Sequence, residues 1–161
     1  ESEEILRDLL EKKCPKHVLE IGSANGISSI VIADCLEKWE GELWTCDRSK
    51  PTFQQAQENF TKAELSNIHA FFGIAPDILQ EMPQKTFDFV FLDAEKKRTL
   101  SFFKAIIPRL SRIGCVLLDD AGLFPKKMQS LFDFLEKEKS IWKWQDIPAE
   151  KGDKMMLIQR R

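Results

Sequence analysis

Short apolar runs alternate with helix-like segments along most of the chain. Near-continuous apolar runs predict strands at residues 18–21, 43–46, 68–72, 87–92 and 115–118. Between them, apolar residues at helical spacing predict helices at residues 27–39, 51–65, 76–82 and 98–110. Strands that are apolar throughout are typical of a parallel sheet covered by helices on both faces. The alternation therefore predicts an α/β domain with right-handed crossovers.

The two ends of the chain depart from this alternation. Residues 3–13 mix charges with spaced apolar positions, which predicts an amphipathic helix that ends at Cys14-Pro15. Beyond Asp120, a predicted helix at 125–139 precedes two apolar runs, 141–145 and 154–159, whose short connection predicts an antiparallel pair at one sheet edge. The expected fold class is a Rossmann-like, doubly wound α/β sheet, mostly parallel, with an antiparallel C-terminal edge hairpin.

Length and composition narrow the class of protein. A chain of 161 residues predicts one domain, residues 1–161. The net charge of -2 gives no overall electrostatic case for nucleic acid. No apolar run approaches the roughly 18 residues of a spanning helix, and no signal-peptide pattern opens the chain, so we expect a cytoplasmic protein without a membrane partner. The four scattered cysteines indicate neither a zinc site nor a disulfide framework.

The first predicted strand runs into a turn bracketed by Gly22 and Gly26. A dinucleotide fingerprint needs a further glycine between these two, and Glu20 places a carboxylate where a phosphate would be repelled. A cationic ligand without phosphate, such as S-adenosylmethionine, fits better. Asp47, about 20 residues beyond the turn, can accept hydrogen bonds from ribose hydroxyls. A plain tight turn is the alternative reading of the two glycines.

Acids also follow the later predicted strands. Asp93 follows one strand, and Asp119 and Asp120 follow the next, so the three carboxylates are expected to converge at the ligand-binding edge of the sheet. Like charges at close range call for a cation, and oxygen ligands favour Mg²⁺, Mn²⁺ or Ca²⁺. The alternative is that Asp119 and Asp120 cap the following turn through hydrogen bonds to the backbone.

Three segments together resemble one enzyme family. The sequence FDFVFLDAEK at residues 87–96 resembles the D-A-D-K segment of the divalent-metal-dependent O-methyltransferases of the catechol and caffeoyl-CoA type. The sequence IGCVLLDD at residues 113–120 is similar to that family's G-G-x-x-x-x-D-N segment, and residues 20–28 match its first motif. The resemblance covers nearly the whole chain.

The resemblance implies a role for individual residues. It implies that Asp93, Asp119 and Asp120 hold the divalent cation, and that Lys96 is the catalytic residue beside the acceptor hydroxyl, whose proton it takes if the cation lowers its pKa. It implies that Asp47 holds the ribose and that the turn at residues 73–76 flanks the adenine. The donor-binding residues expected in all are Glu20, Gly22, Ser23, Gly26, Ser28, Asp47, Arg48, Gly73, Ala75 and Asp93.

The chain departs from the family pattern in three places. Asp120 stands where the family has asparagine, which adds a negative charge to the cation site. Ala75 and Pro76 replace polar residues of the adenine-flanking turn. Only residues 3–13 precede the first strand, whereas family members carry additional helices that close over the acceptor, so we expect a lid that is truncated, disordered or supplied by a partner subunit, as in a homodimer.

Several functions remain open at this point. The leading expectation is methyl transfer to a small hydroxylated, aromatic acceptor. Methylation of a hydroxylated tRNA base is less favoured, although basic residues lie near the expected cleft at 96–98 and 126–127. A domain that binds S-adenosylmethionine without catalysis is a third reading. A dehydrogenase is disfavoured by Glu20 and by the missing glycine.

Overall fold

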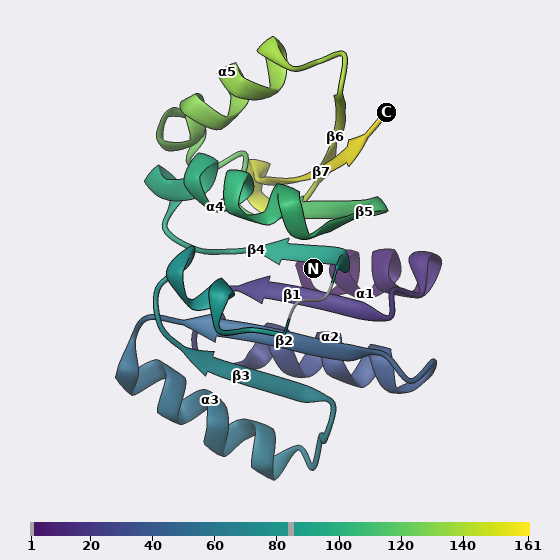
Figure 1. Ribbon diagram of the computed structural model, residues 1–161, viewed down its shortest axis with the longest axis vertical. Coiled ribbons are helices and arrows are strands. Elements are labelled where there is room, and N and C mark those ends of the chain that lie inside the picture. Colours follow the sequence, from purple (N-terminus) through teal and green to yellow (C-terminus); the bar gives the residue numbers. More distant parts are fainter. Residues whose placement is uncertain (1, 84–85) are drawn as a thin grey trace.

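The computed structural model describes residues 2–83 and 86–161, and within them the strands form one mixed sheet (Figure 1). The strand order is β3-β2-β1-β4-β5-β7-β6. The strands are β1 (His17–Ile21), β2 (Glu42–Asp47), β3 (Ile68–Phe72), β4 (Phe87–Leu92), β5 (Leu110–Leu118), β6 (Trp142–Pro148) and β7 (Lys154–Arg160). The α-helices are α1 (Ser2–Lys13), α2 (Ile27–Glu37), α3 (Lys50–Lys62), α4 (Thr99–Ile106) and α5 (Gln129–Lys137).

Strands β1 to β5 run parallel, and β7 runs antiparallel to both β5 and β6. The hairpin of β6 and β7 at one sheet edge confirms the prediction from the two C-terminal apolar runs. The expected Rossmann-like fold class is therefore correct. β6 is longer than predicted and takes in residues that were expected to form the connection.

Helices cover the two faces of the sheet with separate cores. Side chains of α1 and α2 pack on one face, where Val18 of β1 contributes to the core. Side chains of α4 and α5 pack on the other face together with Leu19 and Ile21 of the same strand. Figure 1 places α1 and α2 behind the sheet and α4 in front of it. Burial on both faces explains why the strands are almost continuously apolar.

Two predicted helices were wrong in extent. The segment at 76–82 forms only a short 3₁₀ helix, η1 (Asp77–Gln80), which buries Ile78 and Leu79. The helix predicted at 98–110 stops at Ile106, and the 3₁₀ helix η3 (Ile107–Arg109) follows it. Pro108 lacks the N–H group that a longer α-helix requires. Strand β5 then begins at Leu110, opposite Phe87, five residues earlier than predicted.

Further 3₁₀ turns lie in the connections around the sheet: η2 (Lys96–Arg98), η4 (Pro125–Met128) and η5 (Glu150–Gly152). The turns η2 and η4 pack against each other although they are far apart in the sequence. In the parts of the chain that the structure describes, no helix is both long and apolar enough to cross a bilayer.

Candidate functional site

The parallel strands end at a common edge, where their terminal acids come together. Leu92 at the end of β4 lies opposite Leu118 at the end of β5, so the residues that follow, Asp93 and Asp119, are neighbours. The backbone continues this register for one residue, since the Asp119 amide donates to the Leu92 carbonyl at 3.2 Å. Asp93 and Asp119 therefore lie side by side at the edge of the sheet, while the cation site expected at Asp93, Asp119 and Asp120 stays a prediction.

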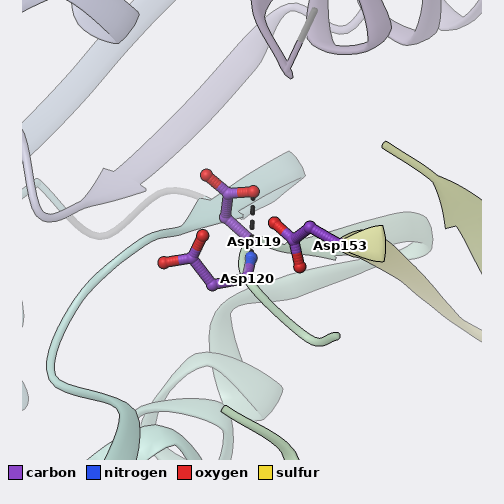
Figure 2. Close-up of side chains that lie close together, drawn as sticks. All are labelled: Asp119, Asp120 and Asp153. Atoms are coloured by element: carbon purple, nitrogen blue, oxygen red, sulfur yellow. Dashed lines mark hydrogen bonds between the residues drawn. The ribbon is translucent and has the colours of Figure 1, made fainter. Parts of the chain in front are cut away.

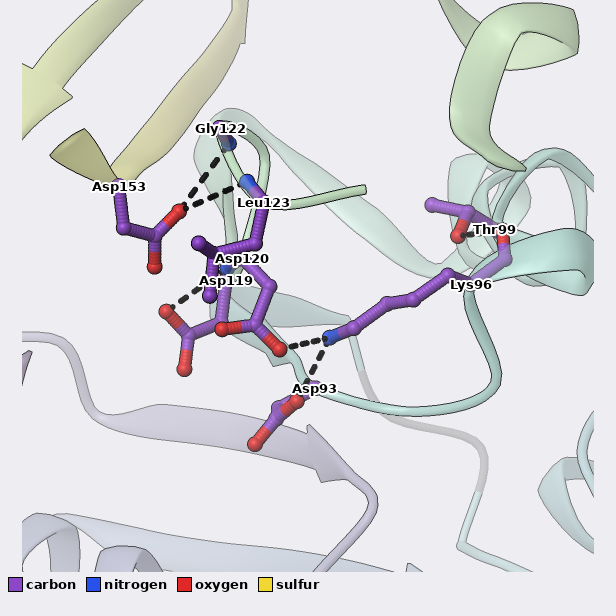
Figure 3. A network of polar contacts seen from close by, with 8 residues as sticks. All are labelled: Asp93, Lys96, Thr99, Asp119, Asp120, Gly122, Leu123 and Asp153. Atoms are coloured by element: carbon purple, nitrogen blue, oxygen red, sulfur yellow. Dashed lines mark hydrogen bonds and ion pairs between the residues drawn. The ribbon is translucent and has the colours of Figure 1, made fainter. Parts of the chain in front are cut away.

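Lys96 lies between two of these carboxylates (Figure 3). Its Nζ is 2.8 Å from Asp93 Oδ1 and 3.1 Å from Asp120 Oδ2, and its side chain is only 12% exposed. Burial alone lowers the pKa of Lys96, but the charges and hydrogen bonds of Asp93 and Asp120 outweigh burial and raise this pKa above its ordinary value. Lys96 is therefore an ammonium at neutral pH in this arrangement.

Asp119 occupies a different environment from its neighbours. Burial raises the pKa of Asp119 to about 6, and the nearby charges of Asp93 and Asp120 act in the same direction. Its Oδ1 accepts a hydrogen bond of 3.0 Å from the Asp120 amide. Asp120 itself has a φ of 54°, a left-handed conformation that is uncommon outside glycine. The tight turn after β5 thus points adjacent carboxylates in different directions.

Asp153 joins this cluster although the sequence did not single it out. One carboxylate oxygen from each of Asp119, Asp120 and Asp153 lies within 4.8 Å of the others, as Figure 2 illustrates. Asp153 immediately precedes β7, and an antiparallel strand begins at the edge where its parallel neighbour ends. That rule is the sequence signal that could have identified Asp153, once β7 was paired with β5.

Glu20 is fully buried inside β1 and faces hydroxyl groups. Ser28 donates to Glu20 Oε1 at 2.5 Å, Thr45 donates to Oε2 at 2.6 Å, and Ser29 also donates to Oε2. Burial raises the pKa of Glu20, and the three hydroxyls oppose that rise. Sequence reasoning missed Ser29 and Thr45, because nothing in the local pattern pairs them with Glu20.

A cleft opens beside the acid cluster, along the ends of β1, β2 and β4. The space that a water-sized sphere can occupy in the cleft is about 190 Å³, which is smaller than a typical ligand pocket, and part of the cleft is open to solvent. The cleft is lined by Ile21, Gly22, Ala24, Cys46, Asp47, Arg48, Ser49, Gly73, Ile74, Ala75, Asp93, Ala94, Glu95, Arg98 and Phe102. Gly22 adopts a φ of +100°, and a Cβ there would lie 1.9 Å from the Asp93 carbonyl oxygen. Only glycine therefore allows β1 and β4 to approach this closely at the cleft floor.

Polar contacts shape the rim of the cleft. Asp47 Oδ2 accepts from the Ala24 amide at 2.8 Å, and Oδ1 accepts from the Ser49 amide at 2.7 Å. These bonds fix the carboxylate at the end of β2 and leave lone pairs for a ligand. Arg48 pairs with Glu95 at 2.9 Å, which links the loops after β2 and β4.

The residues predicted to bind the methyl donor divide into two groups. Six of them line the cleft: Gly22, Asp47, Arg48, Gly73, Ala75 and Asp93. The other four lie beneath or beside it: Glu20, Ser23, Gly26 and Ser28. Ser23 is buried, and its Oγ has no hydrogen-bond partner among the residues that the structure describes. Gly26 faces Phe60, and Ser28 is bound to Glu20, so both support the turn rather than form the cleft wall.

The donor set beside the cleft consists of carboxylate oxygens, which suit a hard divalent cation. Lys96 engages Asp93 Oδ1 and Asp120 Oδ2, which leaves the second oxygen of each carboxylate for a cation. The residues present thus fit such a cation. Fold and cleft together define a Rossmann-like domain with a ligand cleft and a charged centre at the carboxyl edge of the sheet.

Comparison with known proteins gives the family. A family model described as a methyltransferase domain matches residues 19–121, and the chain belongs to that family. O-methyltransferase ankF of Aspergillus thermomutatus is 31% identical over 108 residues, which cover 65% of this chain and 45% of that protein. Catechol O-methyltransferase of Mycobacterium tuberculosis is 30% identical over 106 residues, covering 65% and 47%. The chain thus spans about half the length of the curated relatives it matches.

A solved structure extends the likeness over the whole fold. An O-methyltransferase from Bacillus cereus, crystallised with S-adenosylhomocysteine, superposes with a TM-score of 0.87 at 20% identity. The match covers 99% of this chain and 80% of that one. At this level of identity, the likeness supports the arrangement of strands and helices.

Proposed function

We propose that the chain transfers a methyl group from S-adenosylmethionine to a hydroxyl of a small aromatic acceptor, with the help of a divalent cation. The observation that carries the proposal is the pair of ion pairs that holds Lys96 between Asp93 and Asp120 beside the cleft. Membership of the methyltransferase-domain family and the O-methyltransferases among its relatives support the same reaction.

The cleft suits a cationic nucleoside. Asp47, already oriented by two amides, offers acceptors to a ribose. Arg98 stacks over Phe102 at 5.1 Å and donates to the Ala75 carbonyl, which gives the opposite wall a flat, partly apolar surface for a base. Asp93 lines the cleft near its end and favours positive charge there. The arrangement offers the donor hydrogen bonds and a stacking wall.

The oxygen ligands for the cation come from Asp93, Asp119 and Asp120, the residues expected from the sequence, while Asp153 Oδ1 is taken up by the amides of Gly122 and Leu123. Such a cation, when bound, lowers the pKa of a hydroxyl and fixes its direction.

Lys96 contributes positive charge and a hydrogen-bond donor at the acceptor oxygen. The role of general base, expected from the resemblance, requires a neutral amine, whereas Asp93 and Asp120 raise the pKa of Lys96. In the arrangement described here, the Lys96 ammonium stabilises negative charge on the acceptor oxygen. The base role stays a prediction.

The experiment measures binding and transfer separately. Calorimetry with S-adenosylhomocysteine tests the cleft, and mass spectrometry with a panel of catechols and other phenols tests transfer in Mg²⁺, Mn²⁺, Ca²⁺ or EDTA. We expect S-adenosylhomocysteine to bind and methylation to depend on the cation. We also expect a large loss of transfer in Lys96→Met. The matched control Lys97→Met should transfer normally, since Lys97 is exposed. Binding without transfer to any acceptor would favour a non-catalytic domain, and absence of binding would refute the proposal.

A hydroxylated tRNA base is a second candidate acceptor. The contact between η2 and η4 brings exposed Lys97, Lys126 and Lys127 to one rim, which favours a polyanion. Salt-dependent tRNA binding that weakens in Lys126→Gln/Lys127→Gln would support this acceptor, and no binding at low salt would exclude it. The cytoplasmic location and the homodimer expected from the sequence stay predictions.

A further inference from the structure

Asp153 links the C-terminal hairpin to the loop that carries Asp119 and Asp120. Its Oδ1 accepts hydrogen bonds from the amides of Gly122 at 3.1 Å and Leu123 at 3.2 Å (Figure 3). The backbone of Asp153 is itself fixed, because its amide donates to the Glu150 carbonyl and its carbonyl accepts from the Ala149 amide, each at 3.0 Å. The side chain therefore extends from a rigid turn toward the loop.

The loop after β5 depends on this contact for its path. It leaves the strand through the left-handed Asp120, and its next amide, that of Ala121, donates to the Lys154 carbonyl at 2.9 Å. Gly122 approaches the hairpin so closely that a Cβ would lie 3.0 Å from Asp153 Oδ1. Three consecutive amides of the loop, at residues 121–123, thus bond to the start of β7 or to the residue before it.

We propose that Asp153 is a positioning residue, which holds the 119–123 loop so that the Asp120 carboxylate stays beside Lys96, 3.1 Å from its Nζ. The role in catalysis rests on the proposed function. The hydrogen bonds require an acceptor oxygen at Asp153, whereas its negative charge is dispensable for holding the loop. The methyl-donor cleft is lined by residues outside this loop, so donor binding does not depend on Asp153.

The test compares Asp153→Ala, Asp153→Asn and wild type in the full chain. Hydrogen exchange measured by NMR reports the Gly122 and Leu123 amides, and we expect exchange about tenfold faster in Asp153→Ala but within about twofold of wild type in Asp153→Asn. We expect kcat for methyl transfer to fall roughly 10- to 100-fold in Asp153→Ala, with the KM for S-adenosylmethionine unchanged, because misplaced groups lose rate rather than donor affinity. Asparagine should restore kcat, since its amide oxygen accepts the same bonds.

The control is Glu150→Ala, which removes an exposed acid from the same turn. Glu150→Ala should leave the hydrogen exchange of the Gly122 and Leu123 amides, and kcat, as in wild type. Unchanged hydrogen exchange in Asp153→Ala would overturn the proposal. An Asp153→Asn variant as impaired as Asp153→Ala would also overturn it, because the charge of Asp153 rather than its hydrogen bonds would then matter. If wild type transfers no methyl group, the proposed function fails, while the exchange measurement still decides whether Asp153 holds the loop.

Discussion

Replacing Asp119 by asparagine should stabilise the protein at neutral pH and leave its stability nearly unchanged near pH 4. Burial raises the pKa of Asp119 from an ordinary 3.8 to about 6. The stability associated with this group is fully present below the pKa of the unfolded chain, near 3.9, and is lost as the pH rises through the folded value of about 6. Asparagine carries no charge and avoids that loss.

The size of the expected stabilisation follows from the difference between the pKa of Asp119 in the folded chain and its pKa in the unfolded chain. One pKa unit corresponds to ~1.36 kcal/mol, so the full difference is worth ~3 kcal/mol. Solvent reaches part of the carboxyl group, and screening reduces the expected gain to ~1 to 2 kcal/mol. The hydrogen bond from the Asp120 amide to Asp119 Oδ1 can be kept by the asparagine oxygen, which limits other changes.

Urea denaturation at pH 4 and pH 7.5, in EDTA, measures the free energy of unfolding of both proteins. The exposed Asp8 of α1 provides a control, since Asp8→Asn should change stability by less than ~0.5 kcal/mol at either pH. An equal difference between Asp119→Asn and wild type at both pH values would contradict a raised pKa of Asp119, and so would a variant less stable than wild type at pH 7.5.

Three further predictions concern neighbouring residues. Gly22→Ala should abolish S-adenosylhomocysteine binding in calorimetry, because the new Cβ would collide with the Asp93 carbonyl; unchanged affinity would contradict the close approach of β1 and β4. Asp120→Asn should retain or improve methyl transfer, measured as kcat, and a loss as large as that of Asp93→Ala would argue against this account of the site. Lys96→Met should tighten Mn²⁺ binding about tenfold or more in a calorimetric titration, because the ammonium no longer competes for Asp93 and Asp120, and weaker binding would exclude such competition.

The sequence predicted most of the fold because its signals were local. Each of the first five strands is an apolar run, and an acid directly follows or ends most of them, as Asp93 follows β4. Parallel pairing then places these acids at one edge without further information. The helix boundaries were less predictable, because the spacing of apolar residues does not register Pro108 after α4. It also does not distinguish the single turn of η1 from a longer helix.

The contacts that complete the site were not predictable, because they join distant segments. The hydrogen bond from the Gly122 amide to Asp153 joins residues 31 positions apart. The hydrogen bond from Thr45 to Glu20 joins residues 25 positions apart. One of the two ion pairs of Lys96 is local, since Asp93 precedes Lys96 by three residues. The other ion pair is not local, because Asp120 follows the next strand. The resulting rise in the pKa of Lys96 depends on that second carboxylate as well as the first.

The position of β7 between β5 and β6 affects how the protein forms during synthesis. β6 leaves the ribosome first, but it has no partner in the sheet until β7 has been made and inserted beside β5. The acid-bearing edge next to Asp153 must therefore assemble late, after the strands that line the cleft, β1, β2 and β4, have all been made. A nascent chain arrested before β7 should consequently contain the strands of the cleft but lack the contact between Asp153 and the 119–123 loop.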